Sequence, residues 1–249
     1  MAGTALSGRL NWQLANVVEL LDETAQTKSV VLDAPDWRGH RAGQHIDVRL
    51  TAPDGYQAQR SYSIASGPED DWLVLTVERL DDGEVSPYLT DELTAGDQLE
   101  LRGPIGGYFV WEEQQGGPLL MIAGGSGVVP FRSMLRHRAA ADSDVPARLV
   151  YSTRSLNEVI YRDELSHLNA ADGVQLTFAL TRQWPDDWTG HRGRIDAALL
   201  QRVSWPPQER PLAYICGPSG FVEAAAETLV TNGHEPSRIR TERFGPTGT

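Results

Sequence analysis

Residues 60–66 (Arg-Ser-Tyr-Ser-Ile-Ala-Ser) combine side chains that suit a phosphate group and a flat ring. In a strand, alternation places Arg60, Tyr62 and Ile64 on one face and the intervening serines on the other. A guanidinium can fork onto phosphate oxygens, and a phenol ring offers a flat apolar surface. The alternative is an ordinary strand with an exposed arginine and a packed tyrosine.

Two further segments could hold an anion. Residues 82–86 (Asp-Gly-Glu-Val-Ser) open a predicted short helix with Ser86 as the N-cap, where free N–H groups and the helix dipole favour negative charge. Residues 124–130 (Gly-Gly-Ser-Gly-Val-Val-Pro) lie between a predicted strand and a predicted helix, as a phosphate-binding loop requires. The spacing is Gly-x-Gly-x-x-Pro, which departs from the common dehydrogenase pattern.

Arginines follow the later predicted strands of the chain. Arg154 follows the second strand after the glycine-rich loop, and Thr181-Arg182 follows the third. A 2′-phosphate favours arginines and hydroxyls, whereas the ribose diol of NAD favours a carboxylate. Asp186 and Asp187 lie in the same loop, so NADH remains the alternative donor. A second alternative is that the arginines only keep the surface soluble.

The sequence supports neither a serine hydrolase nor a metal site. Ser126 and Ser219 do not lie in Gly-x-Ser-x-Gly, because Val128 and Phe221 occupy the last positions, so a serine hydrolase is not predicted. The six histidines show no metal-ligand spacing such as His-Glu-x-x-His. We therefore predict no metal site and interpret the histidines as surface or capping residues.

The motifs, taken in order from about residue 12 to residue 246, resemble the ferredoxin-NADP reductase superfamily in a form without a fused iron-sulfur domain. The resemblance rests on Arg-x-Tyr-Ser at 60–63, Gly-Pro-x-Gly at 103–106, the glycine-rich loop ending in Pro130, Cys-Gly-Pro at 216–218 and Glu-x-Phe at 242–244.

The resemblance implies an FAD site on the N-terminal half. Arg60 would bind the pyrophosphate, Tyr62 would lie against the isoalloxazine ring, and the Ser63 hydroxyl would hydrogen-bond the flavin nitrogen that accepts hydride. The turn at 82–86 would supply a second pyrophosphate contact. The other implied FAD-binding positions are Ile64, Val77, Arg79, Gly83, Val85 and Ser86.

The resemblance also implies a nicotinamide site. Thr181 and Arg182 stand where a Ser/Thr-Arg pair commonly contacts the 2′-phosphate, which favours NADPH over NADH. Cys216 would place a small thiol beside the nicotinamide ring, or it is only a small buried residue; no thiol nucleophile is inferred. The other implied positions are Gly125, Ser126, Gly127, Pro130, Arg154, Arg192, Arg194, Gly217 and Pro218.

The C-terminal end would complete the reaction centre. By the same resemblance Glu242 and Phe244 approach the flavin edge, and Phe244 could occupy the nicotinamide position until the cofactor arrives. A packed core phenylalanine is the alternative.

Two patterns of elements must position these residues. The first half has short β-branched runs separated by Gly, Pro and Asp, typical of an antiparallel Greek-key β-barrel. The second half alternates strands and helices, which indicates a parallel α/β sheet. The predicted domains are 1–113 for FAD and 114–249 for NAD(P). The predicted strands are 12–21, 29–32, 45–50, 59–64, 72–79, 98–101, 118–123, 147–151, 174–180, 212–216 and 241–245, and the helices are 86–93, 129–138, 159–168, 196–203 and 218–230.

Composition narrows the class of protein. The 34 acidic and 22 basic residues give a net charge of −12, which argues against nucleic acid or anionic membranes as partners. A single cysteine excludes an internal disulfide and a four-thiolate iron-sulfur cluster. The sequence shows no signal-peptide pattern and no apolar run of about 18 residues, so we expect a soluble cytoplasmic protein.

These observations predict an NAD(P)H-dependent flavoprotein reductase. Electrons would pass from NADPH or NADH through FAD to a separate acceptor protein, such as a ferredoxin or a haem monooxygenase. The acceptor would meet a local basic patch involving Arg38, Arg41 or Arg60. The alternatives are a flavin reductase that releases reduced flavin and a non-catalytic nucleotide-binding or regulatory subunit.

Overall fold

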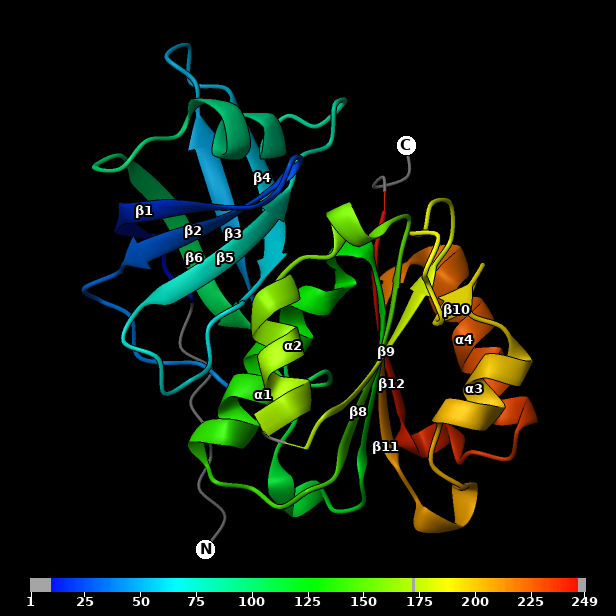
Figure 1. Cartoon of the computed structure of the whole chain (residues 1–249). Coiled ribbons are helices and arrows are strands. Elements are labelled where there is room, and N and C mark those ends of the chain that lie inside the picture. The colour runs from blue at the N-terminus through cyan, green and yellow to red at the C-terminus, as the bar shows by residue number, and fades with distance from the viewer. Residues whose placement is uncertain (1–9, 172, 246–249) are drawn as a thin grey trace, which may run out of the picture.

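The computed structural model describes residues 10–171 and 173–245, which form two six-stranded sheets with four α-helices around the second (Figure 1). One sheet is antiparallel and built from the first half of the chain, and the other is parallel and built from the second half. This arrangement confirms the predicted fold class.

The antiparallel sheet closes into a barrel. Its strand order is β4-β3-β6-β1-β2-β5, and an antiparallel bridge between Ile64 and Leu75 joins the two outer strands. Closure leaves no free sheet edge between these strands. The strands are β1 (Gln13–Thr24), β2 (Thr27–Asp33), β3 (His45–Thr51), β4 (Gln57–Ser63), β5 (Leu73–Glu78) and β6 (Gln98–Ile105).

The barrel interior is filled by alternate residues of its strands. On β5, Leu73, Leu75 and Val77 all point into this core. The predicted short helix follows β5, and its π-helical part spans Tyr88–Glu92. Val85 and Leu89 from this segment are fully buried in the same core, so the turn before the helix is anchored to the barrel.

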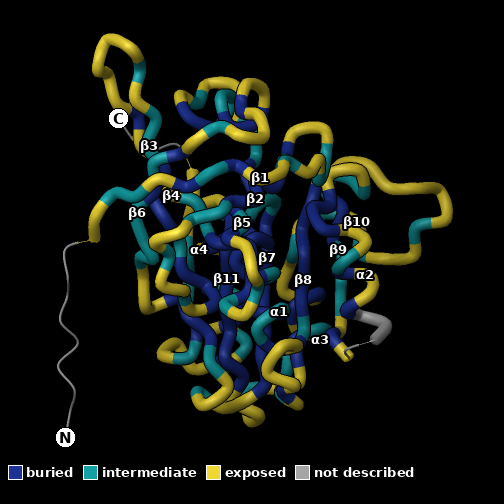
Figure 2. Tube along the Cα trace, turned by 90° about the vertical axis from the view of Figure 1, so that its left-hand side faces the viewer, coloured by how far each residue is buried: buried dark blue, intermediate teal, exposed yellow. Residues whose placement is uncertain are grey.

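The parallel sheet has the order β10-β9-β8-β7-β11-β12. Its two central strands, β7 and β11, are almost continuous buried runs because helices cover both faces. Figure 2 shows β7, β8 and β11 as buried segments running through the middle of the molecule. The strands are β7 (Leu119–Gly124), β8 (Ala147–Thr153), β9 (Gln175–Leu180), β10 (His191–Arg192), β11 (Leu212–Pro218) and β12 (Ile239–Phe244).

The helices divide between the two faces of this sheet, as Figure 1 shows. On β7, Leu119 and Met121 join the core under α1 (Val129–Ala140) and α2 (Arg162–Ala171). Leu120 and Ile122 join the opposite core, under α3 (Ala197–Val203) and α4 (Ser219–Thr231). No helix in the described part of the chain has both the length and the apolar character needed to cross a membrane.

Most predicted elements are present, with two differences. The predicted helix 159–168 begins only at Arg162, because Val159 is extended and Tyr161 has φ of +59°. Val159, Ile160 and Tyr161 are all buried in one core, and consecutive burial does not suit an amphipathic helix. The two-residue strand β10 was not predicted, since it is too short to show a period.

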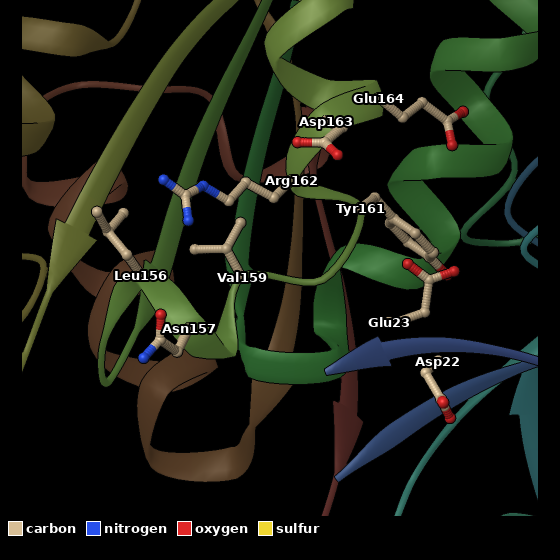
Figure 3. Close-up of a pocket in the computed structure, with 9 residues that line it drawn as sticks. All are labelled: Asp22, Glu23, Leu156, Asn157, Val159, Tyr161, Arg162, Asp163 and Glu164. Carbon is tan, nitrogen blue, oxygen red and sulfur yellow. The ribbon is translucent and has the colours of Figure 1, made fainter. Parts of the chain in front are cut away.

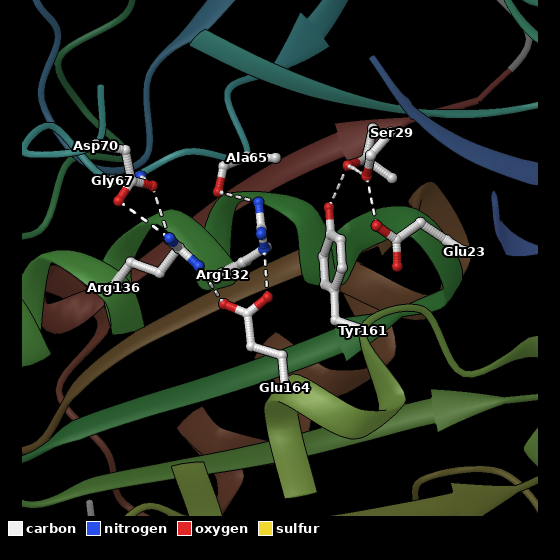
Figure 4. Close-up of polar contacts among 10 residues, drawn as sticks. Glu23, Ser29, Ala65, Gly67, Asp70, Arg132, Arg136, Tyr161 and Glu164 are labelled. Atoms are coloured by element: carbon white, nitrogen blue, oxygen red, sulfur yellow. Dashed lines mark hydrogen bonds and ion pairs between the residues drawn. The ribbon is translucent and has the colours of Figure 1, made fainter. Parts of the chain in front are cut away.

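Charged and polar side chains connect the barrel to the helices of the parallel-sheet domain, as Figure 4 shows. Arg136 of α1 donates to both oxygens of Asp70 in the barrel half, at 2.7 and 3.1 Å, and to Glu164 of α2 at 2.8 Å. Arg132, one turn earlier, donates to Glu164 and to the Ala65 carbonyl. This cluster holds α1 and α2 against the segment that follows β4.

Tyr161 makes a second junction between the domains. Its hydroxyl donates to Thr76 Oγ1 on β5, and Thr76 also bonds Ser29 on β2 at 2.8 Å. The Ser29 hydroxyl lies 2.6 Å from the carboxylate of Glu23 (Figure 4). The buried tyrosine thereby fixes the start of α2 to the wall of the barrel.

Candidate active site

The parallel sheet has a topological switch point between β7 and β11. The chain runs from β7 outward through β8 and β9, then returns to pair β11 on the other side of β7. The helices that follow β7 and β11 therefore leave on opposite faces at the carboxyl ends of these strands. Open α/β sheets generally bind their ligands at such a switch point.

The glycine-rich loop after β7 lies at this switch point. Gly125 has φ of +56°, and a Cβ built there would have no neighbour closer than 3.9 Å. A Cβ on Gly127 would lie 2.1 Å from the Cys216 carbonyl oxygen, so this loop and the end of β11 meet backbone to backbone. Pro130 stands in the first turn of α1, where its missing N–H costs nothing.

Cys216 and Glu242 are register partners on β11 and β12. Cys216 is 2% exposed, and burial, with a contribution from Glu242, raises the pKa of its thiol well above the usual value. A thiol with a raised pKa is protonated at neutral pH. What it offers a bound ring is a small, uncharged neighbour.

Glu242 is half-buried, and its Oε2 atom is buried. Burial raises its pKa to about 7, and its Oε2 has no hydrogen-bond partner among the described residues. Its Oε1 lies 3.7 Å from Nδ1 of His45, at the start of β3 in the barrel. The contact brings the C-terminal end of the parallel sheet against the barrel.

His45 joins the candidate site through this contact, and the sequence did not predict it, since the histidines were interpreted as surface or capping residues. Burial lowers its pKa, and Asp47 works in the opposite direction. That interpretation is also wrong for His234, which is 6% exposed. No spacing motif marks His45, because its partner comes from the far end of the chain.

Ser63 lies directly opposite His45 in the β3–β4 ladder. Side chains of opposed residues share one face, and the next pair on this face shows it: Ser61 donates to Asp47 at 2.7 Å. Ser63, His45, Glu242 and Cys216 therefore come from four strand ends that meet where the two domains touch.

Tyr62 and Ile64 occupy the other face of β4, as alternation predicts. Tyr62 is half-buried against the barrel core, and burial raises the pKa of its phenol. The side chains of Ile64, Val77 and Val85 are fully buried in that core. Any contact of these three positions with a cofactor must come from their backbone.

Arg60 and Arg79 both carry carboxylate partners. Arg60 donates to Glu84 at 2.8 Å, and Glu84 also accepts from the Tyr56 hydroxyl at 2.6 Å. Arg79 donates to Asp91 at 2.7 Å and to Asp81. The turn before the short helix thus lies against β4, as the predicted pyrophosphate site requires, and brings acidic groups with it.

The prediction that Ser86 caps the short helix is wrong. The Ser86 hydroxyl accepts from the Leu80 N–H at 3.1 Å, and the residue at the N-cap is Pro87. Gly83 is needed inside this turn, because a Cβ there would lie 2.7 Å from Ser86 Oγ. Ser86 therefore holds the turn closed from within.

Two of the predicted arginines converge at the edge of the parallel sheet. The N–H groups of Arg182 and Gln183 both donate to the Arg154 carbonyl at 2.9 Å, so the ends of β8 and β9 run together. Thr181 bonds the Thr153 carbonyl through its hydroxyl. Arg154 and Arg182 are both exposed.

Arg192 has local partners instead. Its guanidinium donates to the Trp188 carbonyl at 2.8 Å and lies over the Trp184 ring. Trp188 donates to the His191 carbonyl, and the His191 ring bonds the Arg194 carbonyl. These bonds fold residues 184–194 onto themselves, and sequence reasoning gave the two tryptophans no role.

Phe244 is the register partner of Pro218 and is 36% exposed. It lies at the end of β12, two residues beyond Glu242. The exposure argues against the alternative of a packed core phenylalanine.

Ion pairs with carboxylates reduce the free positive charge of the predicted basic docking patch. Arg41 lies 2.7 Å from Glu112, and Arg60 is bonded to Glu84. Of the three arginines proposed for the patch, only Arg38 is exposed with no carboxylate partner among the described residues.

A groove between the end of β1 and α2 lies apart from these residues (Figure 3). Asp22 and Glu23 line it from the barrel, and Asp163 and Glu164 line it from α2. None of the predicted cofactor residues borders it, and its acidic lining repels phosphates. Within residues 10–171 and 173–245, no cluster of three or more His, Cys, Asp or Glu side chains could hold a metal ion.

Two family models match the chain. Residues 16–110 match the oxidoreductase FAD-binding domain, and residues 121–227 match the oxidoreductase NAD-binding domain. The chain belongs to the ferredoxin-NADP reductase superfamily. Membership confirms the recognised resemblance and the predicted cofactors, FAD and a nicotinamide nucleotide.

Curated members of the superfamily match nearly the whole chain. The glycine betaine monooxygenase reductase subunit of Pseudomonas aeruginosa is 30% identical over 239 residues, covering 94% of this chain and 64% of that protein. The ferredoxin reductase component of 3-ketosteroid-9-alpha-monooxygenase of Mycobacterium tuberculosis is 28% identical and covers 92% and 64%. The chain thus spans less than two thirds of the length of these relatives.

Solved structures of the superfamily share the fold. The FAD/NAD-binding domain of nitric oxide dioxygenase from Vibrio cholerae superposes with a TM-score of 0.84 at 26% identity, over 94% of this chain and 99% of that one. An Amycolatopsis cytochrome P450 reductase superposes with the same TM-score at 27% identity, over 98% and 74%.

Proposed function

We propose that this chain is an FAD-dependent NAD(P)H oxidoreductase that passes electrons from NADPH, or NADH, through FAD to a separate redox protein such as a ferredoxin or a haem monooxygenase. Residues 1–113 would be its FAD domain and residues 114–249 its NAD(P) domain. We further propose that it acts in the cytoplasm.

The meeting of four strand ends carries this proposal. Cys216 and Glu242 come from the nucleotide half, and His45 and Ser63 come from the barrel half. The buried Oε2 of Glu242 lacks a partner among the described residues, as expected of a group that faces a ligand. The space beside Gly125 and the backbone contact at Gly127 fit a dinucleotide at the switch point.

On the barrel, Arg60 and the turn containing Gly83 and Ser86 would hold the FAD pyrophosphate, with Arg79 beside them. Tyr62 would support the ring, and Ser63 would donate or accept a hydrogen bond at its edge. FAD, when bound, supplies the redox chemistry, taking an electron pair from the nicotinamide and releasing it to the acceptor.

On the parallel sheet, Gly125, Ser126, Gly127 and Pro130 would hold the nicotinamide dinucleotide with the turn Cys216–Pro218. Arg154 and Arg182 lie side by side at the sheet edge and support NADPH as the preferred donor. Arg192 and Arg194 belong to a loop with its own internal bonds and support this preference less.

The side chains at the centre supply positioning and a proton. The protonated thiol of Cys216 gives a bound ring an uncharged neighbour without competing for its electrons. Glu242, with a pKa of about 7, holds or releases a proton at the domain junction near neutral pH. The Cys216 thiol is buried away from water, and the Glu242 side chain is half-buried.

The names of the relatives support a partner in trans. Two of them are reductase components of monooxygenases, and a structural neighbour is a cytochrome P450 reductase. We infer that this chain likewise delivers electrons to a protein acceptor.

Anaerobic stopped-flow mixing tests the proposal. The purified flavin-bound protein is mixed with NADPH and, separately, with NADH, and flavin absorbance is followed. Bleaching is expected with at least one nucleotide, faster with NADPH. A protein whose flavin is bleached by neither nucleotide would be a non-catalytic subunit instead.

The second candidate is a flavin reductase that releases reduced flavin. The carboxylate partners of Arg60 and Arg79 favour it, because they oppose retention of a diphosphate. Gel filtration separates the two functions: a protein that loses its flavin on the column and consumes free flavin as a substrate is a flavin reductase.

A further inference from the structure

The guanidinium groups of the proposed FAD pyrophosphate site already have carboxylate partners. These two groups, of Arg60 and Arg79, are bonded to Glu84, Asp81 and Asp91. An incoming diphosphate is itself an anion, so it meets cations that already have anionic partners. Binding at such a site must include the separation of at least one ion pair.

Among these carboxylates, Glu84 competes most directly with a diphosphate for the Arg60 guanidinium. It occupies the end of the Arg60 guanidinium, with Nη2 donating to Oε2 at 2.8 Å. The other half of the Arg60 fork donates to the Gln59 carbonyl at 2.7 Å. Both ends of the fork are thus engaged by the protein itself.

The position of Glu84 is fixed by its neighbours in the chain. Val85 is fully buried in the barrel core, and Ser86 closes the turn through Leu80. The backbone at Glu84 therefore cannot swing away as a unit, and the carboxylate stays within reach of Arg60. Only the side chains of Arg60 and Glu84 are free to rearrange.

Tyr56 gives Glu84 a second hydrogen-bond donor, so Glu84 can lose its contact with Arg60 without being left unpartnered. Its hydroxyl donates to Glu84 Oε1 at 2.6 Å, independently of Arg60. This hydrogen bond, followed by that of Arg60, lowers the pKa of the Glu84 carboxyl. When Arg60 turns to another anion, Glu84 stays ionised and keeps a donor.

We propose that Glu84 is an internal competitor of the flavin pyrophosphate for Arg60, so that FAD binds by exchanging one anion for another on the same guanidinium. This inference rests on the proposed function, since it takes the flavin site to be at Arg60. Its consequence is an FAD that dissociates more readily than Arg60 alone would allow. Glu84 thereby regulates how long the flavin stays on the protein.

Equilibrium binding of FAD to flavin-stripped protein tests the inference, measured by calorimetry or flavin fluorescence. Glu84→Gln keeps the acceptor for Tyr56 and Arg60 but removes the charge, and we expect the FAD dissociation constant to fall about fivefold, as removal of an exposed ion pair permits. Glu92→Gln is the matched control. It removes one exposed carboxylate from the short helix that follows the turn and leaves Arg60 untouched, so its dissociation constant should equal that of the wild type.

Riboflavin, which has no phosphate, is the second probe. Glu84→Gln should leave riboflavin binding unchanged. An unchanged or raised FAD dissociation constant in Glu84→Gln, or an equal gain for riboflavin and FAD, overturns the competition. If neither wild type nor variant binds any flavin, the proposed function falls together with this inference, whereas equal FAD binding by both overturns the inference alone.

Discussion

Glu242 shows how burial alone can set the protonation of a site residue. Its pKa of about 7 lies above the ordinary value for a glutamate because burial disfavours the charged form. A group whose pKa is raised by folding stabilises the fold fully below its unfolded pKa and loses that contribution as pH rises through the folded value.

Glu242→Gln should therefore act on stability in a pH-dependent way. At pH 8 the variant should be more stable than the wild type, by at most about 3 kcal/mol, because it removes a buried charge. Near pH 4 the two should unfold together, since Glu242 is then protonated in both states. Thermal unfolding across this range gives the measurement, and a pH-independent difference would contradict it.

Arg182 can be tested against the choice of nucleotide. Arg182→Ala should raise the KM for NADPH by about tenfold or more, because a charge-assisted hydrogen bond to a phosphate contributes about 1.5–3 kcal/mol. The KM for NADH should change little. Arg202→Ala removes an exposed arginine from α3 and serves as the control. Equal losses with both nucleotides would exclude a 2′-phosphate role.

Individual site residues differ in how far the sequence predicts them. Cys216 and Glu242 belong to motifs, and the register of β11 and β12 then brings them together. His45 has no motif, because its role depends on how the two domains dock, which no local pattern encodes. The ion partner of Arg60 was missed for a similar reason, since Glu84 reaches it only when the turn folds back onto β4.

At the scale of elements, the glycine-rich loop depends on close backbone contact with β11. Gly127→Ala should be strongly destabilising, by several kcal/mol, because its Cβ would lie 2.1 Å from the Cys216 carbonyl oxygen. Gly220→Ala is the matched control in α4, where a Cβ meets nothing within 4 Å and alanine favours the helix. Thermal unfolding of both variants decides the point. A Gly127 variant as stable as wild type would exclude the close approach.

The helices α1 and α2 also act as one unit through Arg136. Arg136→Met should lower stability by about 1–3 kcal/mol, because it leaves Asp70 and Glu164 without their shared cation. Arg162→Met changes an exposed arginine at the start of α2 and should have little effect. Urea unfolding of the two variants provides the comparison, and similar losses would mean that the cluster contributes nothing specific.

Element order was predictable because each half has a distinct period. Alternation with turn residues gives the barrel, and apolar runs followed by helices give the parallel sheet. The start of α2 was not predictable, since a left-handed Tyr161 follows from its burial and its bond to Thr76. The two-residue β10 is held by pairing with β9 and has no local signal.

At the scale of the whole chain, the net charge of −12 would govern long-range encounters with the proposed acceptor. The arginines expected to form a basic patch do not offset it, because Arg41 and Arg60 are ion-paired. A basic acceptor should therefore be attracted and an acidic acceptor repelled. Salt weakens both effects, so the sign of the salt dependence reports the charge of the docking face.

Reduction of cytochrome c, a basic haem protein, by the NADPH-supplied enzyme should slow as salt is raised from about 50 to about 300 mM, because screening shortens the reach of the attraction. With an acidic ferredoxin the rate should rise over the same range. Flavin reduction by NADPH, followed alone in stopped flow at each salt concentration, separates effects on the protein encounter from effects on the nucleotide. A ferredoxin rate that falls with salt would mean that a local basic face around Arg38 outweighs the net charge.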